Sequence, residues 1–152
     1  MSNAVFRHQP VAPDAKIGRV EPDGRAYVAQ FGPDKYVGRV EVDSGRVWEA
    51  RFGPDKLIGQ VNLEDGKCFH ARFGPDEYVG RVDGDGKLYR HVPIAVDEYL
   101  GRITPMPGFA QAGAGLLLLL LPHWEAEQAE SAAARSGEND DRAADAAPKQ
   151  SD

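Results

Sequence analysis

The sequence predicts an all-β protein: a closed array of five β-hairpin units, then a C-terminal hydrophobic helix and a disordered tail. Three observations lead to this fold class. Gly-centred hydrophobic strings recur at nearly constant spacing, turn signals separate short segments of alternating polarity, and a leucine run follows the last unit. Within the repeat, no segment between turn signals reaches the roughly 10 residues that a helix usually needs.

The repeat covers residues 4–104, and each unit is marked by one glycine. The strings IGRV, VGRV, IGQV, VGRV and LGRI place these glycines 20, 21, 21 and 21 residues apart (Gly18, Gly38, Gly59, Gly80 and Gly101). Self-similarity at a fixed period indicates a repeat architecture. Because glycine weakens strand interiors, its recurrence needs a reason. Either it permits a bend or bulge in each unit, or it clears space for a closely packed neighbour.

Two kinds of turn alternate along the repeat. Three of the strings follow Phe-Gly-Pro-Asp, in which proline presets φ and aspartate bonds back to the backbone. The first four strings precede turns such as Pro22-Asp23-Gly24, which favour tight hairpins. Between the turns the polarity alternates. In residues 47–52, Trp48, Ala50 and Phe52 share one strand face, and the corresponding units place Phe31 and Phe73 on that face.

The two ends of the repeat predict that the array closes. Val5-Phe6-Arg7-His8 is similar to Leu88-Tyr89-Arg90-His91, so the chain begins half a repeat early and ends half a repeat late. This offset gives ten strands, and it leaves the first and the last free to pair. Such pairing removes both exposed edges of the sheet.

The repeat resembles the bacterial β-flower repeat proteins, in which β-hairpins surround a central axis. The resemblance rests on the Tyr-Val-Gly-Arg-Val strings and on runs such as Asp85-Gly86-Lys87-Leu88-Tyr89, and it covers about two thirds of the chain. It implies a five-fold hairpin fold. It implies no activity, because none is established for that family.

Residues 105–124 form a hydrophobic segment that carries no charged side chain. As a helix, residues 108–121 would extend about 21 Å, less than the about 30 Å of a bilayer core. Ten strands with small inward residues would leave a lumen. We therefore expect a helical plug that fills the lumen, with a membrane anchor or an oligomer interface as alternatives. The side chains expected to fill or insert are Phe109, Leu116, Leu117, Leu118, Leu119, Leu120 and Leu121.

The acidity of the chain belongs mostly to its tail. The formal net charge is −6, and residues 125–152 carry −5 of it. This Ala-rich tail has no apolar stripe, so we expect marginal helix over residues 125–135 that fades to disorder. The remainder is nearly neutral and gives no strong nucleic-acid signal.

The sequence contains few candidate sites. It has no Walker loop, HExxH, GxSxG or CxxC motif, so we predict no enzyme activity, cofactor or metal. An arginine follows the repeat glycine in four units, and Gln60 replaces it in the third. Gathered on one rim, the arginines would bind anions; alternatively, each pairs with a neighbouring-strand acid such as Glu49. The arginines of this predicted rim are Arg19, Arg39, Arg81 and Arg102.

Two smaller sets of side chains leave alternatives open. His8 and His91 occupy equivalent repeat positions, as a metal pair or as two solvated histidines. Four aromatic residues either form sugar-stacking sites or pack in the core (Tyr36, Trp48, Tyr78 and Tyr99).

The sequence favours a non-enzymatic structural or interaction module whose partner is unidentified. The alternatives are a membrane-associated module anchored by residues 108–121 and a small-ligand or carbohydrate-binding repeat protein. Residues 1–13 lack the apolar core of a signal peptide, so we expect a cytoplasmic protein. If the leucine run were inserted in a membrane, the repeat domain would remain on the cytoplasmic side.

Overall fold

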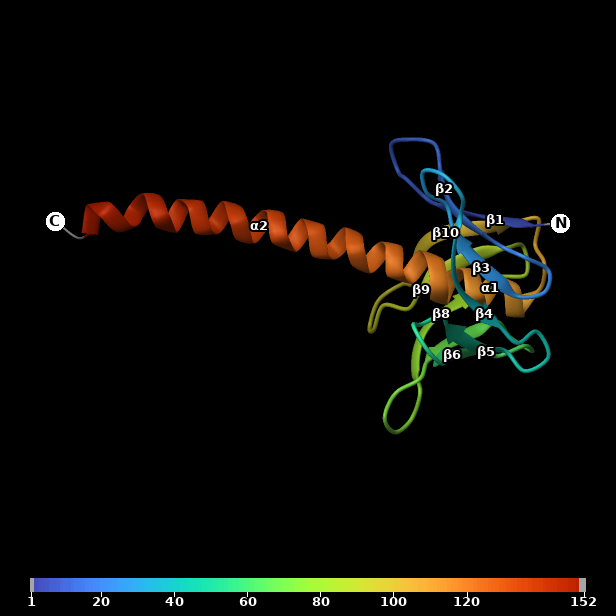
Figure 1. Cartoon of the computed structure of the whole chain (residues 1–152). Helices are drawn as coiled ribbons and strands as arrows, with labels where there is room; N and C mark the ends of the chain where they lie inside the picture. The colour runs from blue at the N-terminus through green and yellow to red at the C-terminus, as the bar shows by residue number, and fades with distance from the viewer. Residues whose placement is uncertain (1, 151–152) are drawn as a thin grey trace. The chain divides into compact units, whose positions relative to one another are not determined.

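The computed structural model describes residues 2–150, with side chains over residues 2–135, and it confirms the closed five-unit hairpin array. Residues up to Pro122 form one compact unit, and those from His123 onward form a second. In the first unit, antiparallel strands close into a barrel in the order β1-β10-β9-β8-β7-β6-β5-β4-β3-β2 (Figure 1). The described strands are β1 (Asn3–Arg7), β2 (Ala15–Val20), β3 (Arg25–Val28), β4 (Lys35–Val40), β5 (Arg46–Glu49), β6 (Lys56–Val61), β7 (Lys67–His70), β8 (Glu77–Val82), β9 (Lys87–Arg90) and β10 (Glu98–Thr104).

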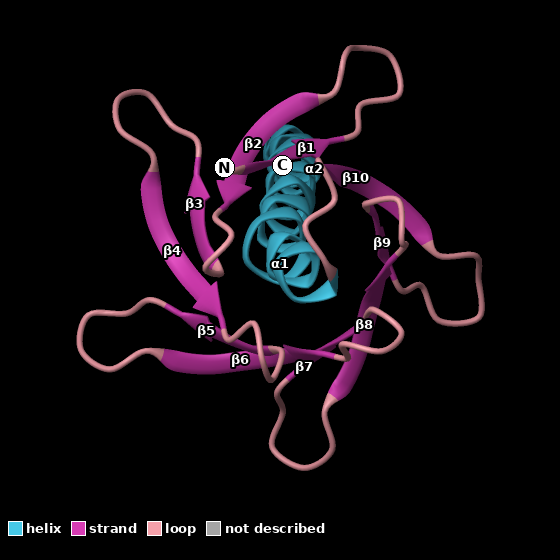
Figure 2. Cartoon of the chain, turned by 90° about the vertical axis from the view of Figure 1, so that its right-hand side faces the viewer, coloured by secondary structure: helices cyan, strands magenta, loops and turns pink. Residues whose placement is uncertain are grey.

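The predicted pairing of the first and last strands closes the barrel. Strand β1 pairs with β10 in the register Val5↔Ile103 and Arg7↔Gly101. Long loops join β1 to β2 and each later pair up to β9 and β10, while tight turns join the remaining neighbours. Figure 2 shows the five long loops spread around the central helix. The long loops therefore lie at one end of the barrel and the tight turns at the other.

The alternation of side chains sets which face is inside, and the inward face is the small aliphatic one. The aromatic side chains of the short strands, such as Trp48 on β5, point outward. Core packing, one of the two alternatives for Trp48, is therefore wrong. Beside them on the short strands, the residues Val5, Ala26, Val47, Cys68 and Leu88 are buried. Two residues beyond each repeat glycine lies a second buried layer, consisting of Val20, Val40, Val61, Val82 and Ile103.

The recurring glycines serve both of the purposes that the sequence left open. The register shifts once per unit at this place, for example between Val47 and Trp48 opposite Gly59, which marks a β-bulge. A Cβ on Gly80 would overlap the carbonyl oxygen of Tyr89 and would lie 2.9 Å from a methyl carbon of Leu116. Glycine therefore permits a close backbone approach on one side and a close helix on the other.

A helix fills the barrel, as the leading alternative expected. The part within the barrel unit consists of α1 (Phe109–Ala114), the π-helical segment η1 (Gly115–Leu120) and the first two residues of α2 (Leu121–Gln150). The leucine run is buried from Leu116 to Leu121. The polar Gln111 is also buried, and its Nε2 donates to the carbonyl oxygen of Pro22 at 2.9 Å. Among the described residues, no helix combines the length and hydropathy of a membrane span.

Successive leucines of η1 face successive barrel units. A Cβ on each repeat glycine would lie 2.9–3.3 Å from one leucine methyl, in the pairs Gly80–Leu116, Gly59–Leu117, Gly38–Leu118, Gly18–Leu119 and Gly101–Leu120. Five equivalent units divide the circle into steps of about 72°, whereas an α-helix turns about 100° per residue. A π-helix is wider and turns only about 80° per residue. The π-helical geometry thus allows five consecutive leucines to serve five consecutive units.

The tail begins within α2. Residues 125–135, expected to be marginally helical, are helical as part of α2 (Leu121–Gln150), and the side chains from Glu130 to Arg135 are exposed. The predicted disorder of residues 136–152 falls where side chains are not described, so it stays a prediction.

Candidate functional site

The outer face of the barrel carries a repeated arrangement that we call the arginine clamp. It consists of the arginine after the repeat glycine, the aromatic residue opposite it on the next strand, and the aspartate of the following long loop. In the fourth unit the Arg81 guanidinium carbon lies 4.0 Å from the centre of the Tyr89 ring. Arg81 Nε donates to Asp97 Oδ2 at 2.9 Å, and Nη1 donates to Asp83 Oδ1 at 2.6 Å. The cation is therefore held between a ring and two carboxylates.

Four of the five units have a complete clamp. The guanidinium carbon lies 4.0–5.3 Å from its ring centre, and Nε lies 2.9–3.4 Å from the aspartate oxygen. The clamp of Arg102 reaches back to the first long loop and so joins the last unit to the first. The complete clamps are Arg19–Tyr27–Asp34, Arg39–Trp48–Asp55, Arg81–Tyr89–Asp97 and Arg102–Phe6–Asp14.

These clamps show where the predicted anion-binding arginines lie. All four recur on one outer face, but each guanidinium already has an aspartate partner, which is the pairing alternative. The partner is an acid of the next loop and not Glu49, because Glu49 accepts a hydrogen bond from Arg51 at 2.7 Å. The rim therefore presents compensated charges.

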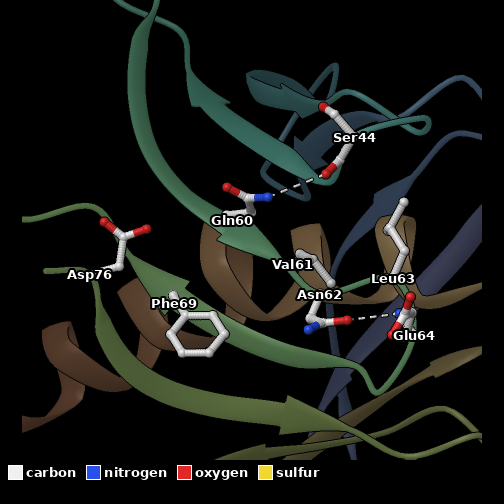
Figure 3. Close-up of a pocket in the computed structure, with 8 residues that line it drawn as sticks. All are labelled: Ser44, Gln60, Val61, Asn62, Leu63, Glu64, Phe69 and Asp76. Atoms are coloured by element: carbon white, nitrogen blue, oxygen red, sulfur yellow. Dashed lines mark hydrogen bonds between the residues drawn. The ribbon is translucent and has the colours of Figure 1, made fainter.

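The third clamp lacks its cation. Gln60 stands in the arginine position, paired with Phe69 on β7, and the matching loop aspartate is Asp76. Gln60 Nε2 donates to the carbonyl oxygen of Ser44 at 3.5 Å, and it makes no bond to Asp76 (Figure 3). Asp76 is exposed, whereas the four other clamp aspartates are partly buried beneath their arginines.

A pocket of about 580 Å³ opens at this third clamp. Its walls include the Phe69 ring, the carboxylates of Asp76 and Glu64, and the amides of Gln60 and Asn62 (Figure 3). Neither carboxylate has a hydrogen-bond or ion-pair partner among the described side chains, although the backbone N–H of Glu64 donates to Asn62 Oδ1 at 2.8 Å. The pocket is thus open, acidic and backed by an aromatic ring.

Two clamp aspartates have shifted pKa values. Burial by itself would raise the pKa of Asp97, but hydrogen bonds from Arg81 and His91 lower it overall. The pKa of Asp14 is likewise lowered, because interactions with His8, the Gln9 backbone and Arg102 outweigh burial. These carboxyl groups therefore remain ionised in the folded protein at neutral pH.

The long loops end in a second repeated feature, which we call the tip ring. Each loop has a fully exposed large apolar side chain, and the fifth loop exposes Val96 as well; the members of the tip ring are Val11, Phe31, Phe52, Phe73 and Ile94. The sequence placed the three phenylalanines on strand faces, but β3, β5 and β7 end before them. Phe-Gly-Pro itself was the available signal, because the Gly-Pro turn begins at the phenylalanine and lifts it off the strand.

The two equivalent histidines contact clamp aspartates, and the single cysteine is buried in the barrel. His8 Nδ1 lies 3.1 Å from Asp14 Oδ1, and His91 Nδ1 lies 3.2 Å from Asp97 Oδ1, so each histidine contacts a clamp aspartate of its own unit. Among the described residues, no group of three or more His, Cys, Asp and Glu side chains is placed to hold a metal ion. Cys68 is buried, and burial raises the pKa of its thiol.

The aromatic residues named as possible sugar-stacking sites lie on the outer face. Tyr36 and Tyr78 lie 5.6 Å from Tyr27 and Phe69 respectively, measured between ring centroids. The Tyr27 ring of the first pair lies under Arg19, whereas the Phe69 ring of the second belongs to the third clamp, which has Gln60 in place of an arginine. No protein-family model, curated protein or solved structure matches this chain.

Proposed function

We propose that this protein is a non-enzymatic interaction module that binds a protein partner through its tip ring. The observation that carries this proposal is the repetition of one fully exposed apolar side chain at the end of every long loop. Single exposed apolar residues are ordinary, so the proposal rests on their recurrence at equivalent places in all five loops.

The tips have no packing role in the fold. A Cβ at Gly32, Gly53 or Gly74, next to the three tip phenylalanines, would meet no atom within 4 Å. Full burial of a phenylalanine stabilises a protein by about 1.5–3 kcal/mol, and these residues gain none of it within the barrel. A partner that covers the tips would recover that free energy.

The surroundings of the tips favour a protein as the partner. Polar residues precede the three phenylalanines along the chain: Gln30, Arg51 and Arg72. Aromatic anchors with a polar rim are typical of protein interfaces. The plugged, closed barrel supplies a scaffold that holds the loops, and rigid scaffolds commonly present binding loops in this way.

We also propose that the chain belongs with the β-flower repeat proteins. Five hairpins arranged around a central helix support this assignment, in addition to the sequence strings. Of the alternative functions, membrane anchoring loses its main argument, because the leucine run packs against the repeat glycines. Binding of a small ligand is favoured by one observation, the pocket at the third clamp.

Site-specific photo-crosslinking tests the tip-ring proposal with a partner of any identity. A photoreactive phenylalanine would replace Phe52 at a loop tip or, as a matched control, Val42 in the tight turn between β4 and β5. Both side chains are exposed. We expect a discrete crosslinked protein from Phe52 that untagged wild-type protein competes away and that a Phe31→Ser, Phe73→Ser background weakens. Equal crosslinking from both ends, or none from Phe52, would contradict the proposal.

A further inference from the structure

The four complete clamps show what this outer face is built to hold. In each, a planar guanidinium lies against an aromatic ring and donates to a carboxylate of the next loop. Cation–π attraction and charge-assisted hydrogen bonds act together on the same group. The ring and the carboxylate are therefore two walls of a cation site, and the protein's own arginine occupies it.

The third clamp retains both walls but has no occupant. Phe69 pairs with Gln60 as Tyr89 pairs with Arg81, and Asp76 stands at the loop position that Asp97 holds in the next unit. Gln60 is shorter than arginine, carries no charge and is directed to Ser44. The space that a guanidinium would fill is the pocket of about 580 Å³.

We propose that this open third clamp binds a guanidinium group from outside the chain, seated between Phe69 and Asp76 where the other units place their own arginine. Asp76 shares the β7–β8 loop with Phe73 of the tip ring, but the proposal does not depend on the function proposed for the tip ring. The ligand is recognised by its guanidinium, whether that group is a free guanidine or an arginine side chain of a partner.

The pocket chemistry selects a guanidinium over a metal ion or a simple ammonium ion. A guanidinium is planar and weakly hydrated, so it stacks on a ring while its edge donates several hydrogen bonds. The pocket offers acceptors around its edge: carboxylates at Asp76 and Glu64 and an amide oxygen at Gln60. In the first and fourth clamps the guanidinium likewise meets a second acid, Glu21 or Asp83. In the third unit Asn62 stands at that position, and the Glu64 carboxylate lines the pocket two residues further along the turn.

The open clamp differs from a merely solvated surface in one respect. Its carboxylates lack any cationic partner among the described side chains, although a basic residue satisfies each equivalent aspartate. Because the site is exposed, we expect weak binding of a small ligand, with a Kd on the order of 1 mM. A partner segment that covers the pocket would bind more tightly.

Titration of the ¹⁵N-labelled full-length protein tests the proposal. The probes are N-ethylguanidine and acetyl-Gly-Arg-Gly-amide, with propylammonium as the comparison cation. We expect saturable shifts of the amide signals around Gln60, Phe69 and Asp76 with both guanidines and weaker shifts with propylammonium. Tighter binding of the peptide would identify a partner's arginine as the source, and equal or tighter binding of N-ethylguanidine would identify a free guanidine.

Variants make the result specific. Gln60→Arg fills the clamp from within and should abolish the shifts, and Asp76→Asn should weaken binding about two- to fivefold. Glu130→Gln, which removes one acid outside the barrel unit, should change nothing. Arg81→Gln opens the fourth clamp and should create a second site around Tyr89 and Asp97. Shifts that do not saturate in the wild type, or that persist in Gln60→Arg, would overturn the proposal.

Discussion

The inner and outer faces of the barrel follow the five-fold repeat with different strictness. Inside, every unit has its glycine, and each glycine faces one leucine of η1. Outside, four units have an arginine clamp and the third has Gln60. The interior is uniform because a single added Cβ would overlap backbone atoms. The exterior tolerates a change because an exposed ion pair contributes only about 0.2–1 kcal/mol. Departures from the repeat on the outer face are therefore where this protein acquires an individual binding property.

Removal of the plug is the strongest way to break the inner face. We expect residues 1–104 alone to lose the folded barrel, while residues 1–122 keep it. Burial of the six leucines contributes roughly 9–18 kcal/mol, as much as the whole stability of a typical domain. The amide dispersion in an NMR spectrum and a cooperative thermal transition measure the difference. A well-folded 1–104 fragment would show that the barrel does not need its plug.

A methyl group added at one repeat glycine tests how closely the inner face is packed. Gly80→Ala should destabilise the barrel by about 1–3 kcal/mol, because the new Cβ meets Leu116 and the carbonyl oxygen of Tyr89. Gly84→Ala is the matched control, since Gly84 lies in the next turn with no atom within 4 Å of a Cβ. The free energies of unfolding from urea denaturation give both values. Equal effects at the two glycines would contradict the assigned role of the repeat glycine.

The fold was largely predictable from the sequence, because its determinants are local. The spacing of the glycines, the turn residues and the half-repeat offset predict ten strands and the β1–β10 closure. The π-helical register was not predictable, because each leucine's direction depends on the barrel that surrounds it. The sequence of the third unit already contained Gln60, but the meaning of that change emerges only when Phe69 and Asp76 are brought to one pocket.

Low pH should remove the stability that the clamp carboxylates contribute, and a substitution of Asp97 measures the share of that one carboxyl group. The pKa of Asp97 in the folded protein is lower than its ordinary value of 3.8. A carboxyl group whose pKa is lower in the folded state than in the unfolded state stabilises the fold above about pH 4. This contribution is lost as the pH falls through the folded-state pKa. We expect Asp97→Asn to lower the melting temperature at pH 7 and to reduce its dependence on pH between about 4 and 2. An unchanged pH dependence in Asp97→Asn would exclude this carboxyl group as a contributor.

Completion of the third clamp should change stability least among these variants, and it should raise stability where the others lower it. Gln60→Arg would place a guanidinium over Phe69 and beside Asp76, which we expect to stabilise the barrel by up to about 1 kcal/mol. Arg81→Gln is the reciprocal change, and it should destabilise by a similar amount because Asp97 and Asp83 lose the guanidinium, and Asp97 keeps only its contact with His91. Both values follow from urea denaturation at low salt, and both should shrink at 1 M NaCl because salt screens exposed charges. If Gln60→Arg destabilised the protein at both salt concentrations, the third unit could not accept a guanidinium, and the equivalence of the five clamps would fail at that unit.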